Sequence, residues 1–175
     1  MDFAERHALR TRIRAMVEPT VELLGLELVA VQFGGGGDNL VMRLAIDKPG
    51  GVTVADCTSV SRALSPEFDV EDPIDGPWRL EVSSPGMDRL VQRDADFIRF
   101  TGLRAKVRMA PDWGRRRYNG ELRGLSGDGD AIRVLVGDEE QLLPRDRVDR
   151  VHLDLTPDEF ATLGHTAAAT EGEPS

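Results

Sequence analysis

The feature that most constrains the fold is a strand that runs straight into a proline-glycine turn near the middle of the chain. Trp78 to Val82 alternate apolar and charged side chains, and Ser83-Ser84-Pro85-Gly86-Met87-Asp88-Arg89 follows directly. Proline and glycine interrupt regular structure, and an acid–base pair comes just after them. The pattern therefore predicts an inter-domain junction made of Ser83, Ser84, Pro85, Gly86, Asp88 and Arg89.

The composition differs on the two sides of this junction. The formal net charge of −9 divides into −6 for residues 1–90, +1 for residues 91–155 and −4 for the remainder. An acidic chain is a poor general binder of nucleic acid, but opposite charge speeds its encounter with basic proteins. We expect an α/β domain at 1–86, an all-β domain at 87–156 and an acidic disordered tail at 157–175.

The first domain begins with a helix and a hairpin. Apolar residues at helical spacing predict a helix over 3–24, with a kink or restart at Pro19. Period-two alternation predicts strands at Leu26–Phe33 and Leu40–Asp47. The glycine run between them is a mobile hairpin tip, because a phosphate loop would lead into a helix and here a strand follows.

A second helical region and a third strand complete the domain. Thr53 and Asp56 have the spacing of a capping box, and Ser65-Pro66 predicts the start of a second short helix. The strand at Trp78–Val82 follows. The order is α-β-β-α-β, with the helices on one face of the sheet.

Short alternating segments fill the second domain, as is typical of a small barrel. A single helical turn is predicted at Leu143–Arg147, and another, capped by Thr156, after the last strand. The predicted strands are Leu103–Met109, Tyr118–Leu125, Ala131–Val136, Gln141–Leu143 and Arg150–Leu155.

No pattern indicates an enzyme, a cofactor, a metal site or a small-molecule substrate. The histidines are scattered, and the single cysteine, Cys57, offers neither a disulfide nor a C-x-x-C metal motif. Ser83 and Ser84 lack the surroundings of a nucleophile elbow. The charged N-terminus and the absence of a long apolar run predict a cytoplasmic protein that does not enter a membrane.

A basic patch is the strongest candidate for partner or RNA binding. Alternation places three cations on one strand face, near an arginine-rich hairpin loop that Trp113 and Tyr118 flank as possible stacking platforms for bases. A solvated strand face with a charged tip that blocks edge pairing explains the same residues. The candidate residues are Arg104, Lys106, Arg108, Trp113, Arg115, Arg116 and Arg117.

Two acidic runs, Glu67–Asp75 and Asp138–Glu140, are the opposite case. Such runs are usually solvated loops. They are also suitable docking surfaces for a basic protein, and the sequence leaves both interpretations open.

Several segments, in order along the chain, resemble the bacterial ribosome maturation factor RimP family. The junction matches nearly throughout, with Met87 where leucine is common. Agreement across both halves makes the resemblance specific. The matching segments are Gly25–Val29, Val70–Ile74, Leu80–Arg89, Phe97–Gly102 and Leu143-Pro144.

The resemblance implies a KH-like N-terminal domain and an SH3-like, Sm-like C-terminal barrel, an α+β architecture. It also implies a non-enzymatic factor for maturation of the small (30S) ribosomal subunit, binding free small subunits. The expected partners are the basic small-subunit ribosomal protein S-twelve and small-subunit ribosomal RNA. Residues 53–75 contain no G-x-x-G loop, so the KH-like label implies a shape and not the usual grip on nucleotides.

The alternative function is a generic Sm-like chaperone that binds single-stranded RNA away from the ribosome. It predicts affinity for free RNA with a steep salt dependence, abolished when Arg115, Arg116 and Arg117 are replaced together. The acidic net charge favours the assembly factor.

Overall fold

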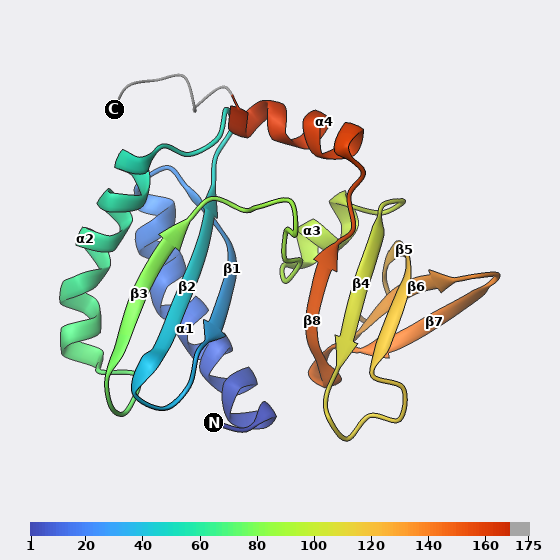
Figure 1. The fold of residues 1–175 in the computed structure, drawn as a ribbon, viewed down its shortest axis with the longest axis horizontal. Coiled ribbons are helices and arrows are strands. Elements are labelled where there is room, and N and C mark those ends of the chain that lie inside the picture. The colour runs from blue at the N-terminus through green and yellow to red at the C-terminus, as the bar shows by residue number, and fades with distance from the viewer. Residues whose placement is uncertain (169–175) are drawn as a thin grey trace. The chain divides into compact units, whose positions relative to one another are not determined.

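The computed structural model describes residues 1–168 and shows an α+β protein (Figure 1). Two compact units make up this part of the chain. One contains Met1–His7 and Gly86–Phe160, and the other contains Ala8–Pro85 and the chain from Ala161. No described helix is both long and apolar enough to cross a bilayer.

The N-terminal elements follow the predicted α-β-β-α-β order. A three-stranded sheet has the order β1-β2-β3, with β1 and β2 antiparallel and β2 and β3 parallel. The parallel pair is possible because a helix makes the crossover between its strands. The elements are α1 (Phe3–Leu23), β1 (Glu27–Gly34), β2 (Leu40–Asp47), α2 (Val54–Glu71) and β3 (Trp78–Ser83).

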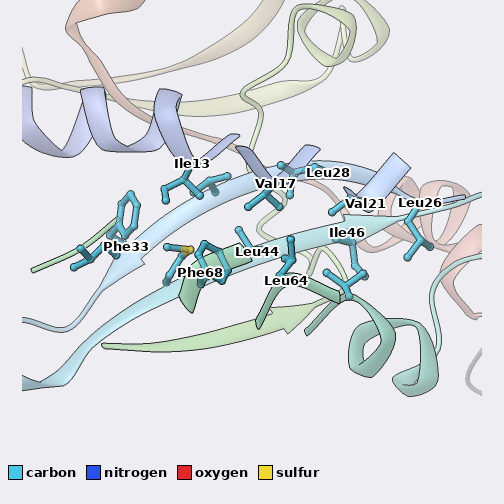
Figure 2. Packing of buried hydrophobic residues seen from close by; sticks show 14 residues of the cluster. Ile13, Val17, Val21, Leu26, Leu28, Phe33, Leu44, Ile46, Leu64 and Phe68 are labelled. Carbon is cyan, nitrogen blue, oxygen red and sulfur yellow. The ribbon is translucent and has the colours of Figure 1, made fainter. Parts of the chain in front are cut away.

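Both helices bury an apolar stripe against the same face of this sheet (Figure 2). Every second residue of β2 from Met42 to Ile46 faces them and is fully buried, which confirms the predicted alternation. In β1 a bulge after Leu28 shifts the register. Leu28 and Val31 therefore both join the core although they are three residues apart. The helical stripes are Ile13, Val17 and Val21 in α1 and Val60, Leu64 and Phe68 in α2.

The prediction that a second helix starts at Ser65-Pro66 is wrong, and of the kink or restart predicted at Pro19 the restart does not occur. Both α1 and α2 continue through their prolines, Pro19 and Pro66. An internal proline costs roughly 3 kcal/mol, whereas burying one large apolar side chain contributes about 1.5–3 kcal/mol. In α2 the buried stripe continues across Pro66 from Leu64 to Phe68, and the Ser65 hydroxyl donates to the Ser61 carbonyl at 3.1 Å.

The predicted capping box at the start of α2 is confirmed. The Asp56 N–H donates to Thr53 Oγ1 at 3.0 Å, and the Thr53 N–H donates to Asp56 Oδ2 at 2.8 Å. The Lys48 ammonium lies 2.8 Å from the same oxygen. Burial alone would raise the pKa of Asp56, but hydrogen bonds from Lys48 and Thr53 outweigh it and lower that pKa.

Replacing Asp56 by asparagine is expected to lower the free energy of unfolding by about 1 kcal/mol at neutral pH. Because folding lowers the pKa of Asp56, its contribution is present above the unfolded-state pKa and is lost as pH falls through the folded-state value. Urea unfolding of wild type and variant should therefore give different midpoints at neutral pH and converging ones in strong acid. Asp69→Asn, an exposed change on the same helix, is the control. Equal midpoints for the two variants at neutral pH would contradict the prediction.

The C-terminal unit is built on a five-stranded antiparallel sheet of order β7-β6-β5-β4-β8. Within residues 1–168 no pairing of β7 with β8 closes this sheet. The residue that follows the junction extends it beyond β8, where Leu90 bridges His152. The elements are α3 (Asp94–Arg99), β4 (Arg104–Met109), β5 (Arg117–Leu125), β6 (Ala131–Val136), β7 (Glu139–Pro144), β8 (Val148–Leu153) and α4 (Pro157–Ala168).

Three short helical segments test the remaining local predictions. The turn before β8 is a 3-10 helix at Arg145–Arg147, as predicted. Thr156 caps α4 through reciprocal hydrogen bonds with Glu159 at 2.8 and 3.2 Å, but this helix is longer than the single turn predicted. Helix α3 was not predicted, and the rest of the predicted tail, 169–175, lies outside the described residues.

The hairpin tip between β1 and β2 contains a 3-10 turn at Gly37–Asn39 and leads into a strand. This geometry agrees with a hairpin tip and not with a phosphate loop. Gly35 has a φ of 70°, and a Cβ there would lie 2.1 Å from the Asn39 carbonyl oxygen, so the turn requires glycine at this position.

Candidate functional surface on the C-terminal sheet

Strand β4 presents its three cations on one face of the sheet. Ala105, Val107 and Met109 are buried on the other face, and Arg104 and Lys106, which alternate with them, are exposed. Arg108 is half-buried. Figure 1 shows β4 between β8 and β5, so this face continues over both neighbours.

The loop that joins β4 to β5 is arginine-rich and exposed. The Arg115 guanidinium lies 4.4 Å from the centre of the Tyr118 ring, and its Nε donates to the Arg117 carbonyl at 3.0 Å. Trp113 is half-buried, and its backbone N–H donates to the Ala110 carbonyl at 3.0 Å. Arg116 and Arg117 are exposed.

Tyr118 is not available as a stacking platform for bases. Tyr118 lies on the buried side of β5 and is only 7 % exposed, and the Arg115 guanidinium lies over its ring. The proposal that it stacks on bases is wrong because it lies one residue past the exposed loop, at a position where the strand alternation turns the side chain inward.

Carboxylates neutralise part of the basic face. Two nitrogens of Arg108, Nε and Nη2, each lie 2.6 Å from Asp149 Oδ2. Asp149 is itself buried on β8. Lys106 lies 3.4 Å from Asp154, and Arg104 is opposite Glu121 in the β4–β5 register.

A further arginine, Arg150, belongs to this face and was missed from the sequence. It lies on β8 directly opposite Arg108. Burial, followed by the positive charge of Arg108, lowers the pKa of the Arg150 guanidinium, while Asp149 opposes the effect. Alternation along β8 indicates that Arg150 and His152 share a face, but only the pairing of β8 with β4 reveals which residues they join.

The acidic run at 138–140 lies at the other edge of the sheet. Glu140 accepts two hydrogen bonds from Arg133, at 2.8 and 3.0 Å. These hydrogen bonds raise the pKa of Arg133 and lower the pKa of Glu140. Part of this run is thus engaged within the sheet. The other run, Glu67–Asp75, forms the last residues of α2 and the turn that follows the helix.

The junction residues lead from β3 into the edge of the C-terminal sheet. Ser83 ends β3, and Ser84, Pro85 and Gly86 form no regular element. The Asp88 carbonyl lies 3.1 Å from His152 Nδ1. Arg89 is buried, with its guanidinium 5.1 Å from the centre of the Phe100 ring.

The described residues contain no group of three or more side chains suited to hold a metal ion. Cys57 packs against the core formed by α1, α2 and the three-stranded sheet. Burial, together with the neighbouring Asp56 charge, raises the pKa of its thiol. A raised pKa leaves little reactive thiolate at neutral pH.

Comparison with protein families gives a match over residues 16–88, to the RimP N-terminal domain. The matched segment begins in α1, contains β1, β2, α2 and β3, and ends in the junction turn. It contains most of the N-terminal core and two whole segments of the sequence resemblance, Gly25–Val29 and Val70–Ile74. This match supports the RimP family of ribosome maturation factors for the chain.

Proposed function

We propose that this protein is a non-enzymatic assembly factor that binds free small (30S) ribosomal subunits during their maturation in the bacterial cytoplasm. The observation that carries the proposal is the match of residues 16–88 to the RimP N-terminal domain. The proposed partners are the small-subunit ribosomal protein S-twelve and the small-subunit ribosomal RNA.

The two units have folds that suit this role. We propose that the N-terminal unit is KH-like, which its α-β-β-α-β order and mixed sheet support. We propose that the C-terminal sheet is SH3-like and Sm-like, which its five short antiparallel strands support. Residues 54–71 form one continuous helix without a G-x-x-G loop, so RNA contact in the KH manner is not part of the proposal.

The test is co-sedimentation of the purified protein with separated small subunits, large subunits and whole ribosomes, at low and moderate salt. We expect association with free small subunits only, persisting at moderate salt. Small subunits isolated from cells that lack the protein are the most informative substrate. Failure to bind them, or equal binding to all three particles that disappears with salt, would overturn the proposal.

A generic Sm-like chaperone for single-stranded RNA is the second candidate, and the basic face over β4 supports it. It predicts tight binding to free RNA without ribosomal subunits. Replacing Arg115, Arg116 and Arg117 together is expected to abolish that binding, measured by fluorescence anisotropy of a labelled oligouridine. Unchanged binding by the triple variant would exclude a role for this loop.

A further inference from the structure

Three arginines from three neighbouring strands lie in one row across the C-terminal sheet. The central one, Arg108 of β4, is directly opposite Arg117 of β5 and directly opposite Arg150 of β8. Directly opposed residues of antiparallel strands share a face, with Cβ atoms about 4.5–5.5 Å apart. Alternation in the sequence predicts only that Arg108 shares a face with Arg104 and Lys106 of the same strand. The pairing of β4 with β5 and β8 is what places Arg117 and Arg150 beside Arg108.

The row is unusual in its sheet because like charges oppose each other there. Directly opposed like charges destabilise a sheet. Among the directly opposed residues of this sheet that the structure describes, arginine opposes arginine in these two pairs alone. The neighbouring positions are complementary or neutral: Arg104 is opposite Glu121, and Lys106 is opposite Asn119.

The carboxylates around the row leave it positively charged. Asp149 is the acid bonded to Arg108, and because it also lies 3.7 Å from Arg6, it balances at most one of the three guanidinium charges. The other nearby acids are engaged elsewhere, Asp154 with Lys106 at 3.4 Å and Glu121 with Arg123 at 3.1 Å. The lowered pKa of Arg150 is a consequence of its burial and of repulsion from Arg108.

We propose that Arg108, Arg117 and Arg150 bind the backbone phosphates of RNA on the outer face of β8, β4 and β5. Guanidinium groups hold phosphate oxygens through paired hydrogen bonds, and an anion relieves the repulsion within the row. Strands lie about 4.8 Å apart, so the row spans roughly 10 Å, an extended line of charge suited to a polyanionic backbone. This inference rests on the proposed function and assigns the RNA component of the small subunit to this face, since a basic protein would be repelled by it.

Fluorescence anisotropy with a labelled oligouridine and the full chain tests the row. The variants are Arg117→Gln and Arg150→Gln, and the matched control is Arg133→Gln. The control removes the same charge from the same sheet, at an exposed ion pair outside the row. We expect each row variant to bind roughly tenfold more weakly. The slope of log affinity against log salt should fall by about 0.7 for each phosphate that the variant no longer neutralises.

The control is expected to stay within about twofold of wild type, because an exposed ion pair contributes little. Equal weakening by Arg133→Gln, or no weakening by Arg117→Gln, would overturn the inference. Arg117 is exposed, so its variant is expected to fold even if the half-buried Arg150 variant does not. An oligoglutamate of similar length is the competing probe, and displacement of RNA by it at equal charge concentration would mean an acidic peptide site instead.

The result is separable from the test of the proposed function. Wild type that binds free small subunits while Arg117→Gln binds oligouridine normally would refute the row and leave the assembly-factor proposal intact. Wild type that ignores small subunits while the row variants bind oligouridine weakly would refute the assembly-factor proposal and leave the row as an RNA site.

Discussion

Replacing Gly120 by alanine is expected to destabilise the C-terminal sheet by about 3 kcal/mol, near the upper end for overpacking. Gly120 lies in β5, opposite Ala105 of β4. A Cβ at this position would lie 2.2 Å from the carbonyl oxygen of Leu135 and 2.9 Å from Val134 Cγ1. The obstacle is mostly backbone of β6, which cannot withdraw without breaking the β5–β6 hydrogen bonds.

Urea unfolding followed by far-UV circular dichroism measures this effect. The control is Gly127→Ala, since a Cβ at Gly127 meets nothing within 4 Å and its φ is not in the left-handed region. The control is expected to unfold within about 0.5 kcal/mol of wild type. If Gly120→Ala unfolds at the same urea concentration as the control, β5 and β6 do not approach each other closely at this position.

The second large effect is expected at Leu64 in α2. This side chain is fully buried at the centre of the stripe that packs on the N-terminal sheet. Truncation of Leu64 to alanine removes the contacts between this side chain and its neighbours and leaves a cavity. We expect the free energy of unfolding to fall by about 3–5 kcal/mol. That is a large part of the roughly 5–15 kcal/mol that stabilises a typical domain.

One of the two tryptophans reports on this unit. Trp78 packs edge-on against Phe68, with ring centres 5.0 Å apart, one turn of α2 away from Leu64. Fluorescence-detected urea unfolding in a Trp113→Phe background therefore follows the N-terminal core. Val70→Ala, on the same helix at a residue 81 % exposed, is the control and should change stability by at most about 0.5 kcal/mol. Similar midpoints for the two variants would mean that α2 does not bury its stripe.

The candidate surface was only partly predictable. The three cations of β4 share a face as a direct result of strand alternation, which involves neighbours in the sequence. Arg150 lies 42 positions after Arg108, and only the register of β8 against β4 brings the two together. The burial of Tyr118 was not predictable in the same way. Strand β5 begins at Arg117 because Arg117 pairs with Arg108, and this pairing turns the next residue, Tyr118, inward.

The sequence by itself determined the α-β-β-α-β order of the N-terminal elements, the capping of α2 by Thr53 and Asp56, and the helical turn at Arg145–Arg147. These depend on short-range periodicity, side-chain bonds to the adjacent backbone and turn chemistry. Only the tertiary structure decided that α1 and α2 run through Pro19 and Pro66, because burial against the sheet outweighs the missing hydrogen bonds. It also decided which arginines meet, because cross-strand register is set by packing between segments distant in the chain.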